Sequence, residues 1–209
     1  MNDRLEKAAL SRADLNLIAQ WIPPKSRVLD LGCGNGLLLK LLRAEKSVSG
    51  YGIELDTEKV AACIENGVNV IQTNLDEGLA YFDSDSFDFV VLSLTLQAMH
   101  KPRELLEEML RVGRNGIVTF PNFAYWRNRT QIALRGKMPV SRELPFKWYD
   151  TPNIHLCTIQ DFEVLCSELG FSIDQSVALR GDGRQSPLLN WLPNMFGEIS
   201  MHKFSKRLS

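Results

Sequence analysis

Short apolar runs recur along this chain, and most are followed by a stretch in which apolar residues return at helical spacing. The runs are too short for helices, and several are apolar at consecutive positions, which is typical of strands covered on both faces of a parallel sheet. The pattern therefore predicts an alternation of strand and helix, repeated five times. The expected strands lie at residues 28–31, 51–55, 68–72, 86–93 and 115–120.

Two further runs, at residues 171–179 and 199–204, raise the number of expected strands to seven. The alternation predicts an α/β fold with a doubly wound, mostly parallel, Rossmann-like sheet. A chain of 209 residues is long enough for one such domain with its own core, and two full domains are not expected. We therefore expect a single domain over residues 1–209.

Polar residues and prolines mark the ends of several expected helices. Apolar residues at helical spacing predict an N-terminal helical segment within residues 1–24, which two consecutive prolines end. Asp56 and Asp76 each precede a stretch that we expect to be helical, so both are expected as N-caps. Thr158 and Asp161 have the spacing of a capping box at the start of another helix.

Composition and charge exclude several classes of function. The chain is 44% hydrophobic, 23% charged and carries a formal net charge of -1, so no global charge attracts it to nucleic acid or to an anionic membrane. It contains no apolar run long enough to span a bilayer, and its charged N-terminus lacks the apolar core of a signal peptide. We expect a cytoplasmic protein with neither a nucleic acid nor a membrane as its partner.

The four cysteines form no C-x-x-C pair and are not grouped with the three histidines at ligand spacing, so no metal site is expected. Cys33 lies inside a glycine-rich turn, where a small residue fits. A thiol nucleophile is the alternative for Cys33, but the neighbouring sequence supplies no base for it. The other cysteines are expected to behave as small hydrophobic residues in a reducing compartment.

The glycine-rich turn follows the first expected strand and precedes a helix. It reads Asp30-Leu31-Gly32-Cys33-Gly34-Asn35-Gly36. Glycine tolerates positive φ and lets a ligand approach the backbone, and the start of the helix adds free N–H groups. The D-x-G-x-G-x-G spacing differs from the G-x-G-x-x-G of dinucleotide-binding turns. It resembles the first motif of class I S-adenosylmethionine (SAM)-dependent methyltransferases, and an acid suits the cationic amino acid end of SAM. Glycines that serve only close packing are the alternative.

The ends of the next strands supply further candidates. Glu54 ends the second strand about 20 residues beyond the glycines, where an acid accepts hydrogen bonds from ribose hydroxyls in nucleotide-binding folds. Leu55 follows it and is expected against the adenine face. The resemblance to SAM-dependent methyltransferases implies a contact with the adenine after the third strand. Many relatives have Asp at this position, whereas this chain has Asn74. Ser93 ends the fourth strand on the ligand side. The expected cofactor contacts are Asp30, Gly32, Cys33, Gly34, Asn35, Gly36, Glu54, Leu55, Asn74, Leu75 and Ser93.

The segment from residue 123 to residue 157 interrupts the alternation and is expected to be a variable lid or interface insert. Aromatic residues are interleaved there with arginines and lysines, a composition that suits a stacked nucleic acid strand, an anionic pocket or a protein interface. A helix with buried aromatics and solvated arginines is the plain alternative. The low net charge argues against nucleic acid. The loop at residues 145–158 is expected over the ligand side, and within it His155 is the best general-base candidate, with a structural histidine as the alternative.

Several longer segments resemble the MetW family of methionine biosynthesis proteins. The most specific are Phe120-Pro121-Asn122-Phe123 and the run from Tyr149 to Thr158, YDTPNIHLCT. The resemblance implies a class I SAM methyltransferase-like fold and a partner, homoserine O-acyltransferase, which such a protein supports as a subunit. The chain is not itself expected to be that acyltransferase, because no serine lies in the G-x-S-x-G frame of an α/β-hydrolase.

Two functions follow as hypotheses. The first is a SAM-fold subunit that supports or regulates homoserine O-acyltransferase in methionine biosynthesis. The second is a catalytically active SAM-dependent methyltransferase acting on an unidentified small molecule, with S-adenosylhomocysteine as its product. Methyl transfer from a sulfonium depends mainly on in-line positioning, so the lack of an obvious base does not exclude it. SAM is expected as the cofactor in either case, as substrate or as a sensed ligand.

Overall fold

The computed structural model describes residues 14–207, apart from residues 142, 181–188 and 190. Its centre is a seven-stranded sheet in the order β3-β2-β1-β4-β5-β7-β6. The first five strands run parallel, and β7 is antiparallel to both of its neighbours, β5 and β6. The predicted α/β class and mostly parallel sheet are confirmed. The strands are β1 (Arg27–Leu31), β2 (Ser49–Glu54), β3 (Val70–Gln72), β4 (Phe87–Ser93), β5 (Gly113–Pro121), β6 (Phe171–Leu179) and β7 (Ile199–Lys206).

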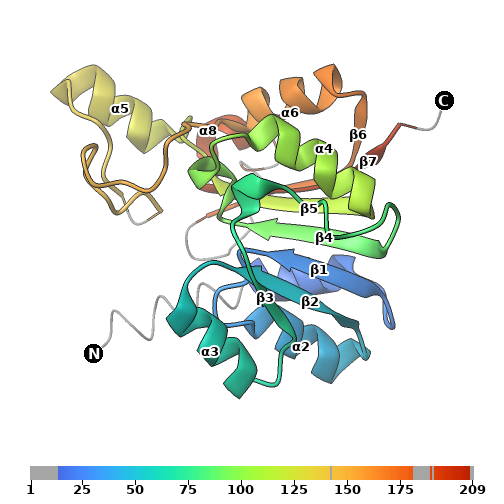
Figure 1. Ribbon diagram of the computed structural model, residues 1–209. Coiled ribbons are helices and arrows are strands. Elements are labelled where there is room, and N and C mark those ends of the chain that lie inside the picture. The colour runs from blue at the N-terminus through green and yellow to red at the C-terminus, as the bar shows by residue number, and fades with distance from the viewer. Residues whose placement is uncertain (1–13, 142, 181–188, 190, 208–209) are drawn as a thin grey trace.

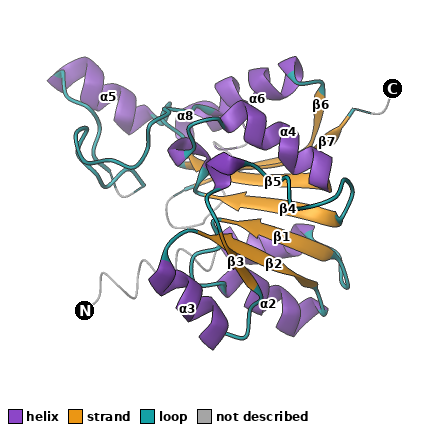
Figure 2. Cartoon of the chain, in the orientation of Figure 1, coloured by secondary structure: helices purple, strands orange, loops and turns teal. Residues whose placement is uncertain are grey.

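Helices cover both faces of the sheet, which Figure 2 shows as one layer of strands between two layers of helices. Successive strand residues point to opposite faces, so Val28 packs with one helical layer and Leu29 with the other. Both side chains are fully buried. The helices are α2 (Leu37–Lys46) and α3 (Thr57–Glu65) on one face, and α4 (Pro102–Val112) and α6 (Ile159–Glu168) on the other (Figure 1).

The N-terminal helical segment is described from residue 14, and residues 14–21 are helical as expected. The earlier part of the predicted segment lies outside the described residues. Ile18 and Ile22 are completely buried and join the core on the α2 side of the sheet. The Lys46 ammonium donates to the carbonyl oxygen of Ile22 at 2.7 Å, which fastens the end of this segment to the end of α2.

Two of the three predicted caps are confirmed. The Asp56 carboxylate accepts hydrogen bonds from the backbone of Glu58 and Lys59, and Thr158 and Asp161 form a reciprocal capping box. The prediction for Asp76 is wrong. Asn74 caps the short helix η1 (Leu75–Glu77) instead, by accepting from the Asp76 backbone N–H at 3.1 Å.

Asp76 is not a cap because its carboxylate contacts His100 instead. It accepts from the backbone N–H of His100 at 2.9 Å and lies 2.7 Å from Nδ1 of the same residue. These contacts tie η1 to the loop between η2 (Leu96–Ala98) and α4. They also lower the pKa of Asp76.

The insert contains α5 (Trp126–Arg135), which extends away from the sheet beyond the carboxyl ends of the central strands (Figure 1). After the long loop that follows, the chain returns to the body at Ile154 and His155, whose backbone N–H groups both donate to the carbonyl oxygen of Gln97. A short helix, α8 (Pro193–Phe196), precedes β7. Within the described residues, no helix is long and apolar enough to cross a bilayer.

Candidate functional site

The strand order fixes where a ligand is expected. β1 pairs with β2 on one side and with β4 on the other. The chain runs outward from β1 through β2 to β3 and then crosses to β4 on the other side of β1, so the strand order reverses between β1 and β4. In open α/β sheets, ligands bind outside the carboxyl ends of strands at such a switch point. The glycine-rich turn of residues 32–36 lies at this position, directly after β1.

All three glycines of the turn adopt left-handed backbone angles, with φ of 67° at Gly32, 57° at Gly34 and 74° at Gly36. Side-chain-bearing residues rarely tolerate such angles, which explains the alternating glycines. A Cβ on Gly32 would lie 2.9 Å from the Thr95 hydroxyl oxygen, whereas a Cβ on Gly34 would meet no atom within 4 Å. The turn is therefore packed closely at Gly32 and has open space next to Gly34.

Glu54 joins the glycine turn to the end of β2. One carboxylate oxygen accepts from the Gly34 backbone N–H at 2.9 Å, and the other accepts from Leu55 and Asp56 at 2.9 and 3.0 Å. The side chain is only 8% exposed. Three N–H donors orient the carboxylate and compensate for its loss of water.

Asp30 lies under the same turn and is 3% exposed. Burial, and secondarily the charge of Glu54, raise its pKa to about 7. A cation bound nearby would favour the ionised carboxylate and lower this pKa. Two buried acids therefore lie close enough for the charge of Glu54 to affect Asp30.

The remaining predicted contacts fall into different environments. Asn35 is exposed, and the Leu55 side chain is 61% exposed and free to cover a planar group. Asn74 uses its amide oxygen as the cap of η1, so its side chain is held in place by the protein itself. The Leu75 side chain is 8% exposed and belongs to the core.

Ser93 ends β4 beside an irregular backbone segment. Its hydroxyl lies 3.1 Å from that of Thr119, and the Thr119 hydroxyl also accepts from the Leu94 backbone N–H at 3.0 Å. Leu94 has a φ of 52°, which is unusual for a bulky residue and typical of functional sites. The apolar periodicity of β4 and β5 gave no signal for Leu94 or Thr119.

Cys33 points away from the open side of the turn. Its sulfur lies 3.7 Å from that of Cys63, and a Cβ on Gly52 would come within 2.4 Å of it. Burial raises the pKa of both thiols. They are therefore poor nucleophiles, and Cys33 serves as the small packing residue that the turn requires.

His155 is exposed and borders a cavity of about 160 Å³ together with Gln97 and Asp161. Gln97 is 3% exposed, and its Oε1 has no hydrogen-bond partner among the described residues. His155 thus lies near the end of β4 but on the α6 side. Its proposed role as a base stays a prediction.

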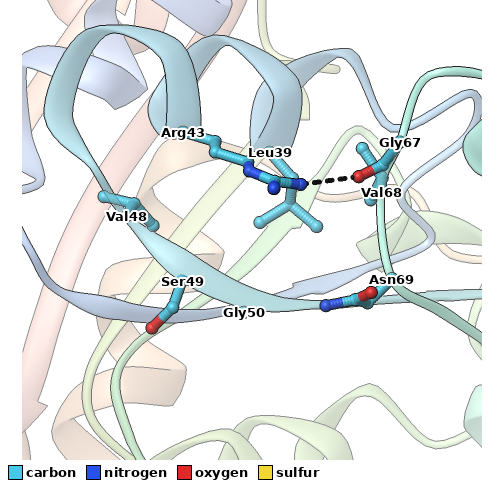
Figure 3. A pocket seen from close by; sticks show the side chains of 8 residues that line it. All are labelled: Leu39, Arg43, Val48, Ser49, Gly50, Gly67, Val68 and Asn69. Carbon is cyan, nitrogen blue, oxygen red and sulfur yellow. Dashed lines mark hydrogen bonds between the residues drawn. The ribbon is translucent and has the colours of Figure 1, made fainter.

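A second cavity, of about 280 Å³, lies away from this site (Figure 3). Ser49 and Gly50 at the amino end of β2 line it, and Arg43 crosses it to donate to the Gly67 carbonyl oxygen at 2.9 Å. It is therefore separate from the carboxyl edge of the sheet. In the part of the chain that the structure describes, no three His, Cys, Asp or Glu side chains form a group that could hold a metal ion.

The sheet order with an antiparallel β7, and the acid-flanked glycine turn at its switch point, define a class I SAM-dependent methyltransferase fold. Solved structures of this class match the chain closely. A SAM-dependent methyltransferase from Archaeoglobus fulgidus gives a TM-score of 0.70 at 16% identity and covers 96% of this chain and 94% of its own. One from Mesorhizobium loti gives 0.68 at 17% identity over 93% and 98% of the two chains.

The family "Methionine biosynthesis protein MetW" matches residues 12–204, and the chain belongs to this family. A bifunctional methionine biosynthesis protein MetXA/MetW from Rhodopirellula baltica is 42% identical over 173 residues, which are 78% of this chain and 28% of that protein. A ubiquinone biosynthesis O-methyltransferase from Hahella chejuensis is 30% identical over 46% of this chain and 42% of its own. The chain thus spans less than half the length of either relative.

Proposed function

We propose that this protein binds SAM at the glycine turn and supports homoserine O-acyltransferase as a partner subunit in methionine biosynthesis. The observation that carries the partnership is the Rhodopirellula baltica relative, whose name joins MetXA and MetW in one chain. Two activities that occur as one polypeptide are natural candidates for a complex when they occur as separate chains. The family membership of residues 12–204 supports the same conclusion.

The residues of the turn fit a SAM molecule. Glu54 offers an oriented carboxylate for ribose hydroxyls, and Asp30 offers a second acid for a cationic ligand. The open space beside Gly34 gives the ligand access to the backbone. When bound, SAM would supply an electrophilic methyl group. The protein would supply binding and orientation.

Co-purification and an activity assay test the partnership. Homoserine O-acyltransferase from the same organism is assayed with and without this chain, and the mixture is analysed by size-exclusion chromatography. We expect a complex and a change in acyltransferase activity. An unchanged activity without a complex would exclude this function.

The backbone strain at Leu94 favours a second candidate, a working methyltransferase acting on a small molecule. Its test is the formation of S-adenosylhomocysteine from SAM in the presence of cell extract as a source of acceptors. Turnover that depends on both the protein and the extract would support this function. Tight SAM binding without turnover would leave SAM as a regulatory ligand.

A further inference from the structure

Residues 126–149, called the arm below, comprise α5 and most of the loop after it. Only one of the ten residues of α5, Asn128, is buried. The Asn128 amide lies at the base of the helix, where it donates to the carbonyl oxygens of Asn122 and Phe123. The rest of α5 extends into solvent beyond the edge of the sheet (Figure 1).

A helix of this length is not expected to be stable by itself. Isolated helices shorter than about 12–15 residues are marginal in water, and helices in proteins depend on packing of an apolar face. On α5 the apolar side chains face outward instead, with Leu134 at 84% and Ile132 at 41% exposure. The helix therefore has an apolar surface that lacks a packing partner within the described chain.

The loop after α5 adds exposed aromatic residues to the arm. Trp148 is 74% exposed and Tyr149 is 63% exposed, and their rings contact each other edge to face at 5.6 Å. Phe146 is 47% exposed. Exposed tryptophan, tyrosine and arginine are the residue types that carry most of the binding energy in protein interfaces.

The arm also differs from the rest of the chain in charge. It contains six lysines and arginines and one glutamate, whereas the other residues contain 18 basic and 24 acidic ones. Two of the cations lie over aromatic rings, Arg127 over Trp126 and Lys147 over Tyr149. A complementary surface would therefore be apolar with an acidic rim.

We propose that the arm is the docking surface for the homoserine O-acyltransferase subunit. The inference rests on the proposed function for the identity of the partner, since the fused relative combines a MetW part with a MetXA part. The exposed apolar helix, the aromatic loop and the basic charge locate the contact. The glycine turn is not part of this surface, so docking and SAM binding use separate residues.

The experiment compares two arm variants with a matched control. Trp148→Ala removes an exposed ring, and Leu134→Ser removes the leucine of α5, which is 84% exposed. Tyr81→Ala is the control, because Tyr81 is 76% exposed but lies between η1 and β4, outside the arm. Affinity for purified homoserine O-acyltransferase and for SAM is measured by titration calorimetry for each variant, and circular dichroism checks folding.

We expect each arm variant to weaken acyltransferase binding at least tenfold and to leave SAM affinity unchanged, with Tyr81→Ala equal to the unmodified protein. If the unmodified protein binds the acyltransferase and both arm variants bind it equally well, the arm is not the docking surface, although the proposed function stands. If the unmodified protein does not bind at all, the proposed function fails.

Analytical ultracentrifugation of the chain alone tests whether a second copy of the chain, rather than the acyltransferase, covers the arm. A monomer with an exposed arm supports the inference. A dimer that Trp148→Ala dissociates would show that a second copy of the chain covers the arm, and would overturn it.

Discussion

At the scale of single residues, Glu54 and Asp30 show how two neighbouring acids acquire different properties. Glu54 accepts hydrogen bonds from three backbone N–H groups, which orient its carboxylate. Asp30 is buried beside this charge, and its pKa rises to about 7. Glu54 is therefore an acceptor held in place by the backbone, whereas the Asp30 carboxyl changes its charge near neutral pH.

Glu54→Gln is expected to weaken SAM binding about ten- to hundredfold, because a hydrogen bond to a charged acceptor contributes about 1.5–3 kcal/mol. Calorimetric titration with SAM measures the change. Glu58→Gln is the matched control. It makes the same chemical change in the first turn of α3, outside the glycine turn. Equal affinity of both variants would contradict the role of Glu54.

SAM affinity is expected to rise by up to about tenfold between pH 6 and pH 8. The Asp30 carboxyl is mostly protonated below a pKa of about 7 and mostly ionised above it, and only the ionised form attracts a cation. Asp30→Asn cannot titrate, so titrations of this variant with SAM over the same pH range isolate any contribution from the ligand's own amino group. An identical pH dependence in both proteins would refute the assignment.

At the scale of elements, local sequence signals predict where a helix starts when its N-cap is complete. Thr158 and Asp161 satisfy each other's backbone N–H groups at the start of α6. Asp76 had the sequence position of a cap, yet Asn74 two residues earlier took that role. The difference arises because His100, which is remote in sequence, contacts the Asp76 carboxylate.

Thr158→Ala is expected to lower the free energy of unfolding by about 1 kcal/mol, because it removes an N-cap acceptor. Thr158→Ser keeps the hydroxyl and should stay close to the original stability. Urea denaturation followed by circular dichroism measures both. A loss of equal size in the two variants would mean that the methyl group, rather than the cap, stabilises α6.

At the scale of the whole molecule, the loop that follows the proposed docking arm returns to the body near the end of β4, close to the predicted SAM contact Ser93. The loop after the arm returns to the body through two hydrogen bonds to the Gln97 carbonyl oxygen, a few residues beyond Ser93. A connection of this kind allows binding at one proposed site to change affinity at the other. Any such coupling must be reciprocal.

If SAM acts as a sensed ligand, it will alter the affinity for homoserine O-acyltransferase by the same factor by which the acyltransferase alters the affinity for SAM. Typical couplings are about 5- to 150-fold. Calorimetry of each ligand, with the other absent and then saturating, gives both factors. Glu54→Ala should abolish the SAM effect on acyltransferase activity, and an intact response in that variant would exclude sensing through this site.

The sequence by itself determined the strands, most helix ends and the glycine turn. These features depend on local causes, namely apolar periodicity, capping side chains and the backbone freedom of glycine. The same causes made Glu54 and Asp30 candidates, because Glu54 ends β2 and Asp30 is the next-to-last residue of β1, at the edge where open α/β sheets bind ligands.

Only the tertiary structure decided the features that depend on residues far apart in the chain. The antiparallel insertion of β7, the burial of Leu75 and the contact between Asp76 and His100 each require elements to pack first. The exposure of α5 is the clearest case. Its composition suited a buried or an exposed helix equally, and only the path of the chain away from the sheet left its apolar side chains in solvent.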